Sequence, residues 1–238
     1  MQAFLLAAGL GTRLRPLTLS RPKALVEVKG RTLLETNIQR LAETGARRIV
    51  VNVHHFAQMM RDYVASRPWP AEVLVSDESH LLLDTGGALR HAAPLFLPDE
   101  PILTYNVDVL SSFSLREMLL RHARSHALAT LAVSRRDTSR LLLFRGGQLV
   151  GWRNRQNGAE LWCGPRQDAV ETEERAFSGI AVVSPSLLAL LPPATAPYPI
   201  IPEYIRLAQS HRIQPFEHPA AEWVDVGKPD ALRALNSQ

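Results

Sequence analysis

The chain has 238 residues, of which 46% are apolar and 21% charged, and it carries a net charge of +4 at neutral pH. A chain of this length buries about 70% of the surface that its unfolded form exposes, so it can build a sizeable core, and this composition excludes a disordered or fibrous protein. The basic residues are scattered, and no apolar stretch approaches the roughly 20 residues that span a bilayer, so we expect neither a nucleic-acid nor a membrane partner.

Strand and helix patterns alternate along the first half of the chain. An apolar run at residues 3–8 predicts a buried strand, and Thr32 with Glu35 forms a capping box that predicts a helix ending near Gly45. We expect further strands at 48–53, 72–76, 101–108 and 128–134, and further helices at 55–67, 86–96 and 114–126. This order predicts an α/β fold, a Rossmann-like three-layer sandwich with a mostly parallel sheet.

The pattern changes after residue 140. Residues 140–154 predict an antiparallel hairpin that turns at Gly146 and Gly147, and the polar stretch 155–175 predicts a mobile excursion. Strands are then expected at 176–184 and 212–218, and helices at 185–191, 200–211 and 229–236. Because no repeat or linker interrupts the chain, we expect one domain over residues 1–238, with 140–175 as a small antiparallel accessory element.

Cysteine usage and the N-terminus bear on the compartment. Cys163 is the single cysteine, which leaves no partner for an intrachain disulfide. No charged segment followed by an apolar core resembles an export signal. The sequence therefore predicts a cytoplasmic protein.

A loop with two glycines and several cations follows the first predicted strand, in the stretch LAAGLGTRLRPLTLSRPKALVEV at residues 6–28. It lacks the G-x-x-x-x-G-K-[ST] pattern of a P-loop, and Leu14 stands where a dinucleotide fingerprint needs its third glycine. Gly9 and Gly11 precede Thr12 and Arg13, and Pro22-Lys23 comes later in the loop. Free backbone N–H groups and two cations at a strand end indicate a site for several phosphates.

This loop resembles the signature of the sugar-1-phosphate nucleotidyltransferases, which is G-x-G-T-R, a spacer and P-K. Further stretches resemble the family in the expected order, namely LLDTGGAL (82–89), NVD (106–108), FSGI (177–180) and WVDVGKPDALRALN (223–236). The resemblance covers almost the whole chain and implies the short, single-domain branch with the nucleotide-diphospho-sugar transferase fold. The chain departs from the pattern in its Asn-Val-Asp, where Asn-Gly-Asp is more usual, and it lacks the Gln that many uridylyl and thymidylyl enzymes place before the glycines.

The resemblance implies transfer of a nucleotidyl group from an NTP to a sugar 1-phosphate, with Mg²⁺ as cofactor. It implies Asp108 and Asp225 as metal ligands, Arg13 on the β- and γ-phosphates, and Lys23 near the α-phosphate, so that the catalytic residues are Arg13, Lys23 and Asp108. The implied nucleotide-binding residues are Ala8, Gly9, Gly11, Thr12, Arg13, Lys23 and Gly87, and the implied sugar-phosphate residues are Asn106, Ser178 and Gly179.

The chemistry of this reaction explains the need for cations. The attacking phosphate monoester is mostly dianionic at neutral pH because its second pKa is about 6, so no base has to remove a proton. Nucleophile, electrophile and leaving group are all negatively charged, and charge compensation is the main task of the protein.

Several readings of the substrate stay open. Whole-chain resemblance favours UTP with N-acetylmuramate 1-phosphate, while the carboxylates of Asp77 and Glu78 favour guanine and hence GTP with mannose 1-phosphate. A phosphocholine-type cytidylyltransferase shares the loop, and a regulatory homologue without catalysis is the alternative outside enzymes. The presence of Arg13, Lys23, Asp108 and Asp225 argues against the last.

Two other groups of residues have ordinary interpretations. His122 and His126 lie one helical turn apart and could bind zinc together, but no third ligand is evident, and a solvated or packing role is favoured. Trp152, Trp162 and Trp223 could stack on a sugar, although packing in the core or at its rim is the default for aromatic residues. The oligomeric state is not encoded in any feature of the sequence that we can interpret.

Overall fold

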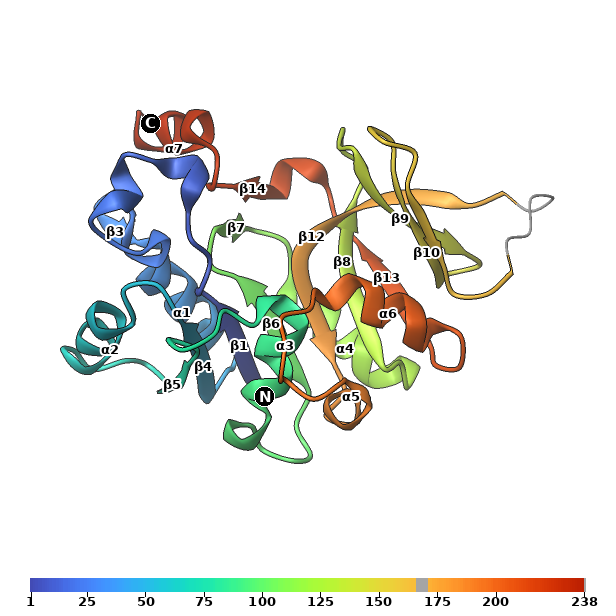
Figure 1. Cartoon of the computed structure of the whole chain (residues 1–238), viewed down its shortest axis with the longest axis horizontal. Coiled ribbons are helices and arrows are strands. Elements are labelled where there is room, and N and C mark those ends of the chain that lie inside the picture. Colours follow the sequence, from blue (N-terminus) through green and yellow to red (C-terminus); the bar gives the residue numbers. More distant parts are fainter. Residues whose placement is uncertain (166–170, 238) are drawn as a thin grey trace.

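The structure is a computed structural model that describes residues 1–165 and 171–237, shown in Figure 1. The strands are β1 (Gln2–Leu6), β2 (Glu27–Val28), β3 (Arg31–Thr32), β4 (Arg48–Val53), β5 (Glu72–Asp77), β6 (Ile102–Asn106), β7 (Val109–Ser111), β8 (Ala129–Ser134), β9 (Arg140–Arg145), β10 (Gln148–Asn154), β11 (Glu160–Trp162), β12 (Glu173–Val183), β13 (Ile213–Glu217) and β14 (Trp223–Asp225). The helices are α1 (Leu33–Glu43), α2 (Ala57–Ala65), α3 (Asp84–His91), α4 (Leu115–Ser125), α5 (Ser186–Leu190), α6 (Ile200–Ala208) and α7 (Pro229–Asn236).

The central sheet has the strand order β11-β10-β9-β12-β6-β1-β4-β5, and β8 joins β12 to β13. β1 pairs in parallel with both β4 and β6, and β5 continues the parallel part beyond β4. β12 runs antiparallel to β6 and β8, which makes the sheet mixed. The predicted α/β class with a mostly parallel core is confirmed.

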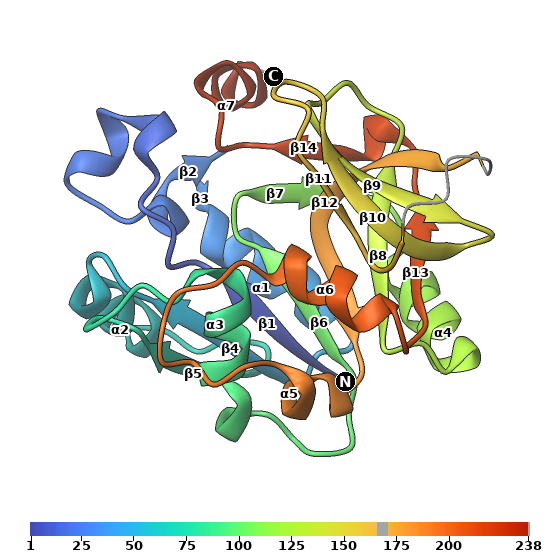
Figure 2. The ribbon, with the colours of Figure 1, turned by 45° about the vertical axis from the view of Figure 1, so that its right-hand side comes forward.

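Alternation along the strands divides the core into two layers. Ala3 and Leu5 of β1 belong to the cluster that contains the apolar residues of α1, α2 and α4. Phe4, between them, belongs to the cluster with α3, α5 and α6, and Figure 2 shows these helices on the two sides of the sheet. Since successive side chains of a strand point to opposite faces, one apolar run supplies both layers of the predicted sandwich.

The predicted helix starts match the structure at both capping boxes. The N–H of Glu35 donates to Thr32 Oγ1 at 3.1 Å before α1, and the N–H of Glu117 donates to Ser114 Oγ at 3.1 Å before α4. Other boundaries differ. The strand expected to reach residue 108 ends at Asn106, and the helix expected at 86–96 covers Asp84–His91 and is followed by a short 3₁₀ turn at Ala93–Leu95.

The predicted hairpin at 140–154 is formed by β9 and β10, which pair antiparallel. It does not stand apart from the sheet, because the first residues of β12 pair with β9. Within the stretch expected to be a mobile excursion, Glu160–Trp162 forms β11 on the edge of β10. Residues 166–170 of that stretch lie outside the described residues, and its mobility stays a prediction.

Two short antiparallel ribbons were not predicted, because strands of two or three residues carry too little alternation. One joins β2 to β3, and the other joins β7 to β14. The second brings the C-terminal segment beside β6, since Asp225 pairs with Val109 and the N–H of Val226 donates to the carbonyl of Asp108 at 2.8 Å. Figure 1 shows α7 beside the N-terminal segment that contains β3.

In the described ranges 1–165 and 171–237, we find no helix with both the length and the apolar character needed to span a membrane.

A buried histidine illustrates how polar groups are satisfied inside this fold. His122 of α4 is 5% exposed, and its Nδ1 and Nε2 lie 2.9 Å from Thr130 Oγ1 and 3.1 Å from Ser184 Oγ. The Ser184 hydroxyl donates to the carbonyl of Ala127, so it accepts from Nε2–H, and Nδ1 accepts from Thr130. This neutral form fits a packing role, and burial lowers the pKa of His122 to about 4. His126 is exposed at the end of the helix.

We expect His122 to destabilise the protein in acid. A folded-state pKa of about 4, below the usual 6.5, means that the unfolded chain binds the proton more tightly, so stability falls as the pH drops from about 6.5 to about 4. The difference between the two pKa values corresponds to at most roughly 3 kcal/mol of the free energy of unfolding. Urea unfolding of His122→Gln between pH 4.5 and 7.5 should show a flatter pH dependence than the wild type. His126→Asn, which tolerates the left-handed conformation there, should keep the wild-type slope; equal slopes for all three proteins would contradict the assignment.

Candidate functional site

The site lies at the carboxyl ends of β1 and β6, where the loop after β1 begins. The N–H of Val107 donates to the carbonyl of Leu6 at 3.0 Å, so the two strand ends stay paired to the edge of the sheet. The loop contains three short 3₁₀ turns, η1 (Thr12–Leu14), η2 (Leu17–Leu19) and η3 (Lys23–Leu25). The position agrees with the rule that ligands bind beyond the carboxyl ends of parallel strands.

Gly11 is required by the shape of this loop. Its φ is +63°, and a Cβ there would lie 2.9 Å from Thr18 Cγ2 and 3.1 Å from Lys23 Cβ. The Thr18 hydroxyl donates to the carbonyl of Gly11 at 2.8 Å. The glycine therefore lets the start of the loop fold back onto η3, which brings Lys23 to the strand end.

The same loop offers unused backbone donors. The N–H groups of residues 9 to 13 make no hydrogen bond to any described residue, whereas those of Ala7 and Ala8 both donate to Asn52 Oδ1, at 2.6 and 3.3 Å. At Gly9 a Cβ would meet nothing within 4 Å, so the space above its backbone is open. Successive free N–H groups are a favourable environment for an anion.

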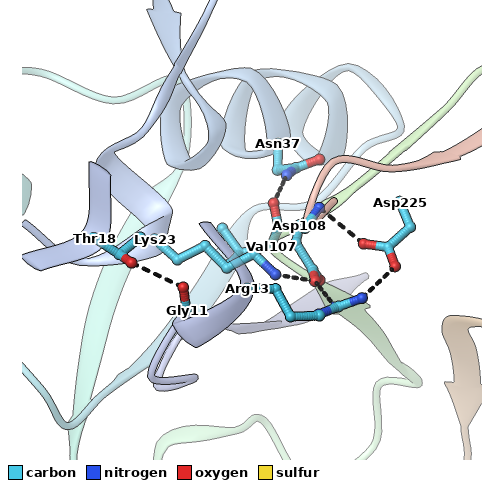
Figure 3. A network of polar contacts seen from close by, with 9 residues as sticks. Gly11, Arg13, Thr18, Lys23, Asn37, Val107, Asp108 and Asp225 are labelled. Atoms are coloured by element: carbon cyan, nitrogen blue, oxygen red, sulfur yellow. Dashed lines mark hydrogen bonds and ion pairs between the residues drawn. The ribbon is translucent and has the colours of Figure 1, made fainter. Parts of the chain in front are cut away.

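Two cations and two carboxylates meet beside this loop, as Figure 3 shows. Lys23 Nζ binds Asp108 Oδ2, and Arg13 lies 3.1 Å from Asp225 Oδ2 and 3.6 Å from Asp108 Oδ2. The Lys23 side chain is 10% exposed, while that of Arg13 is 55% exposed. We call Arg13, Lys23, Asp108 and Asp225 the ionic centre; its formal charges cancel.

Neighbouring residues contact the backbone before Asp108 and the carboxylate of Asp225. Asn37 of α1 donates to the carbonyl of Val107 at 2.8 Å, and the N–H of Gly227 donates to Asp225 Oδ1 at 2.8 Å. A Cβ at Gly227 would lie 2.5 Å from Lys23 Nζ and 2.8 Å from Arg13 Nη2. Sequence reasoning had missed Gly227 and Asn37, although the glycine of Asp-Val-Gly was a signal for a close approach.

Two cavities adjoin the ionic centre and share Asn106 and Asp108 in their walls. The first, of about 450 Å³, is lined on one side by Ala8, Gly9 and Lys23. The second, of about 610 Å³, is lined by Arg13 and Asp225 and extends towards β9, β10 and β12. The two cavities are therefore neighbours that share Asn106 and Asp108.

A buried amide and carboxylate form a wall of the first cavity. Asn52 Nδ2 donates to Glu78 Oε1 at 2.8 Å, and the N–H of Leu83 donates to Glu78 Oε2 at 3.2 Å. Burial raises the pKa of Glu78, although these hydrogen bonds oppose the shift. Since Asn52 also accepts from Ala7 and Ala8, the pair connects β4 and β5 to the start of the loop.

The predicted Thr-Gly-Gly segment lies partly away from the cavity. Asp84 and Thr85 line it, but the N–H groups of Gly86 and Gly87 donate to the carbonyl of Tyr198 at 3.0 and 3.2 Å. A Cβ at Gly86 would lie 2.5 Å from the Tyr198 ring. The packing of the chain accounts for these glycines, and contact between Gly87 and a nucleotide stays a prediction. Thr12 is exposed at the start of η1.

On the second cavity, a bulge in β12 brings Gly179 against Asn106. The register of β12 shifts between Phe177 and Ala181, and Gly179 has a φ of +71°. A Cβ there would lie 2.6 Å from Asn106 Nδ2. Ser178, in the same bulge, is fully buried, and its hydroxyl oxygen lies 2.8 Å from His218 Nε2 and 3.0 Å from Arg136 Nη1.

The donor set at Asp108 and Asp225 fits a magnesium ion. Mg²⁺ usually binds one or two carboxylates and completes its shell with water and substrate phosphates. Two half-buried carboxylates that both contact Arg13 meet that requirement. Across the part of the chain that the structure describes, no group of three or more His, Cys, Asp or Glu side chains is placed to hold a metal by itself.

The comparisons agree with this geometry. The sequence matches the family described as Nucleotidyl transferase over residues 2–141. The N-acetylmuramate alpha-1-phosphate uridylyltransferase of Caulobacter vibrioides is 32% identical, over 99% of this chain and 96% of that protein. The mannose-1-phosphate guanyltransferase of Pichia angusta is 30% identical, but the aligned region is 96% of this chain and 61% of that protein. The solved inositol-1-phosphate CTP transferase from T. maritima shares the fold, with a TM-score of 0.76 and 18% identity over 99% of this chain and 94% of that one. The chain therefore belongs to the nucleotidyl transferase family, as a sugar-1-phosphate nucleotidyltransferase.

Proposed function

We propose that the protein transfers the uridylyl group of UTP to N-acetylmuramate 1-phosphate and releases pyrophosphate. The observation that carries the choice of substrates is the 32% identity to the Caulobacter vibrioides uridylyltransferase over nearly the full length of both chains. Mannose 1-phosphate with GTP is the second candidate, supported by the 30% identity to the Pichia angusta enzyme.

The reaction forms one bond and breaks another at the α-phosphorus of the nucleotide. An oxygen of the sugar phosphate bonds to that phosphorus, and the bond to the bridging oxygen of the β-phosphate breaks, so that both electrons of that bond leave with pyrophosphate. No proton has to be removed from the nucleophile. The protein therefore acts by positioning the two anions and compensating their charge.

The ionic centre supplies this compensation in our proposal. Lys23 lines the first cavity and contacts Asp108, which both cavities share, and this position supports a role for its ammonium on the α-phosphate and the incoming phosphate. Arg13 is more exposed and stands beside the free N–H groups of the loop, which suits the β- and γ-phosphates. Arginine can bind such oxygens with two parallel hydrogen bonds.

Asp108 and Asp225 would hold Mg²⁺ in this scheme. When bound, the ion would compensate phosphate charge and orient the two substrates. Asn37 and Gly227 keep the carboxylates in place through the carbonyl of Val107 and through Asp225 Oδ1. Arg13, which contacts both carboxylates, is free to turn to phosphate because its side chain is 55% exposed.

Removal of either cation should slow turnover without unfolding the protein. We expect Arg13→Ala and Lys23→Ala to lower kcat by about 10²- to 10³-fold, the usual effect of losing an electrostatic donor at a reacting group. Arg21→Ala is the matched control, because Arg21 is an exposed cation of the same loop. Near-normal turnover in either variant, with unchanged melting, would remove that residue from the catalytic set.

Metal dependence tests the two carboxylates. Asp108→Asn keeps the size of the side chain but removes the charge that a hard cation prefers, so activity should collapse and excess Mg²⁺ should restore only part of it. Asp225→Asn should behave in the same way, and Asp230→Asn, at an exposed position of α7, should not. Full activity of the wild type in EDTA would contradict a metal site at these residues.

The nucleotide is tested by measuring pyrophosphate release with ATP, CTP, GTP, UTP and dTTP against the 1-phosphates of N-acetylmuramate, mannose and glucose. We expect the highest kcat/KM with UTP and N-acetylmuramate 1-phosphate. A preference for GTP of more than about tenfold, or about 1.4 kcal/mol of transition-state discrimination, would overturn the choice of base and leave nucleotidyl transfer intact.

A further inference from the structure

The second cavity contains a cation that the ionic centre does not use. Arg136 follows β8 and lines this cavity with Arg13 and Asp225. Its guanidinium donates to Ser134 Oγ at 2.9 Å, to Ser178 Oγ at 3.0 Å and to the carbonyl of Phe177. All three acceptors are neutral, and no carboxylate of a described residue lies within 4.0 Å of this guanidinium.

A half-buried charge without a counter-ion is unfavourable in free energy, and the pKa of Arg136 reflects this. Burial lowers the pKa of Arg136 to about 10, although the more distant charge of Asp225 opposes the shift. The group stays charged at neutral pH. An anion that enters the cavity and binds next to such a half-buried cation would stabilise its charge.

The guanidinium is held in one orientation. One face lies over the Trp223 ring, 3.9 Å from its centroid, and the indole N–H of Trp223 donates to the carbonyl of Ser178 at 2.8 Å. His218 Nδ1 lies 2.9 Å from the carbonyl of Pro219, so Nδ1 is the donor and Nε2 accepts from the Ser178 hydroxyl. The Ser178 oxygen is then left to accept from Arg136, and its hydroxyl has no donor left for a sugar.

The place of Arg136 differs from that of the ionic centre. Trp223 and Asp225 lie two residues apart on β14, so their side chains share a face and are separated by about 7 Å along the strand. Arg136 stacks on the Trp223 ring, and Arg13 binds the Asp225 carboxylate. A sugar whose 1-phosphate reaches the ionic centre would therefore present a different part of its ring to Arg136.

We propose that Arg136 binds a second acidic group, a carboxylate carried by the sugar ring, and thereby selects acidic sugar 1-phosphates over neutral ones. The inference rests on the proposed transfer to a sugar 1-phosphate. Three of the five N–H donors of the guanidinium are used by Ser134, Ser178 and Phe177, and two remain for a carboxylate. Ser178 and His218 act as positioning residues that hold Arg136.

The experiment combines removal of the arginine with removal of the carboxylate. Values of kcat/KM are measured with saturating UTP for N-acetylmuramate 1-phosphate and for N-acetylglucosamine 1-phosphate, which has the same ring without the acidic ether. We expect the wild type to favour the acidic sugar by more than tenfold. In Arg136→Gln the acidic substrate should lose about 10- to 100-fold, the usual range for a charge-assisted hydrogen bond, and the neutral one less than threefold.

Two further variants separate binding from a structural role. Arg135→Gln, at the exposed neighbouring arginine, should leave both substrates unchanged. Ser178→Ala keeps the charge of Arg136 but frees its orientation, so it should raise KM for the acidic sugar more than for the neutral one. Melting temperatures of all variants are measured in parallel.

The outcomes distinguish this inference from the proposed function. Equal losses on both sugars in Arg136→Gln would mean that Arg136 serves the shared phosphate or the fold, and would overturn the inference alone. A wild-type preference for a neutral sugar 1-phosphate would also overturn the inference and leave nucleotidyl transfer standing. Absence of transfer from any NTP to any sugar 1-phosphate would overturn the proposed function, and the inference with it.

Discussion

The ion pairs among Arg13, Lys23, Asp108 and Asp225 are the constraint on which the site depends. They join residues 212 positions apart in the chain, since Arg13 binds Asp225. The Lys23 and Asp108 side chains are 10% and 18% exposed, so the loss of one partner would leave the other as a poorly solvated charge. The signature loop and the C-terminal strand therefore hold each other at the edge of the sheet. The same pairs keep two cations beside the cavities, where in our proposal phosphate oxygens replace the carboxylates as their partners.

Backbone groups carry much of the geometry around this centre. The carbonyl of Val107 accepts from Asn37, and the N–H groups of Ala7 and Ala8 donate to Asn52. The side-chain amides of Asn37 and Asn52 belong to α1 and β4, which lie beside the site. The core of the sandwich therefore positions the ends of the loop. Gly227 contributes by what it lacks, because a Cβ would occupy the space of Lys23 Nζ.

The fold class, both capping boxes and the pairing of the hairpin at 140–154 followed from local signals in the sequence. That Asp108 and Asp225 lie close together could be predicted only from the family resemblance. The strands β7 and β14, which bring them together, have three residues each and show no recognisable alternation. The contacts of Gly87 with the Tyr198 segment depend on how α3 packs against a distant loop, which no local pattern encodes. Arg136 was overlooked for a similar reason. Its lack of an acidic partner is a property of the folded chain, and the sequence shows only one arginine among many.

The first cavity is lined mostly by residues from the first part of the chain, whereas the second also takes residues from β10, β12 and β14. The family match covers residues 2–141, which include the signature loop, Glu78 and Asp108 and so most of the first cavity. Arg136 and its partner Ser134 lie within this range, whereas Ser178, His218 and Trp223, which also hold Arg136 in place, come after residue 141. The match therefore includes the signature loop and Arg136 itself, but not the segments of β12 and β14 that pack around Arg136. Asn106 and Asp108 belong to both walls and so connect the two cavities. If Arg136 selects the sugar as we propose, substrate choice should depend on how β12 and β14 pack around this arginine.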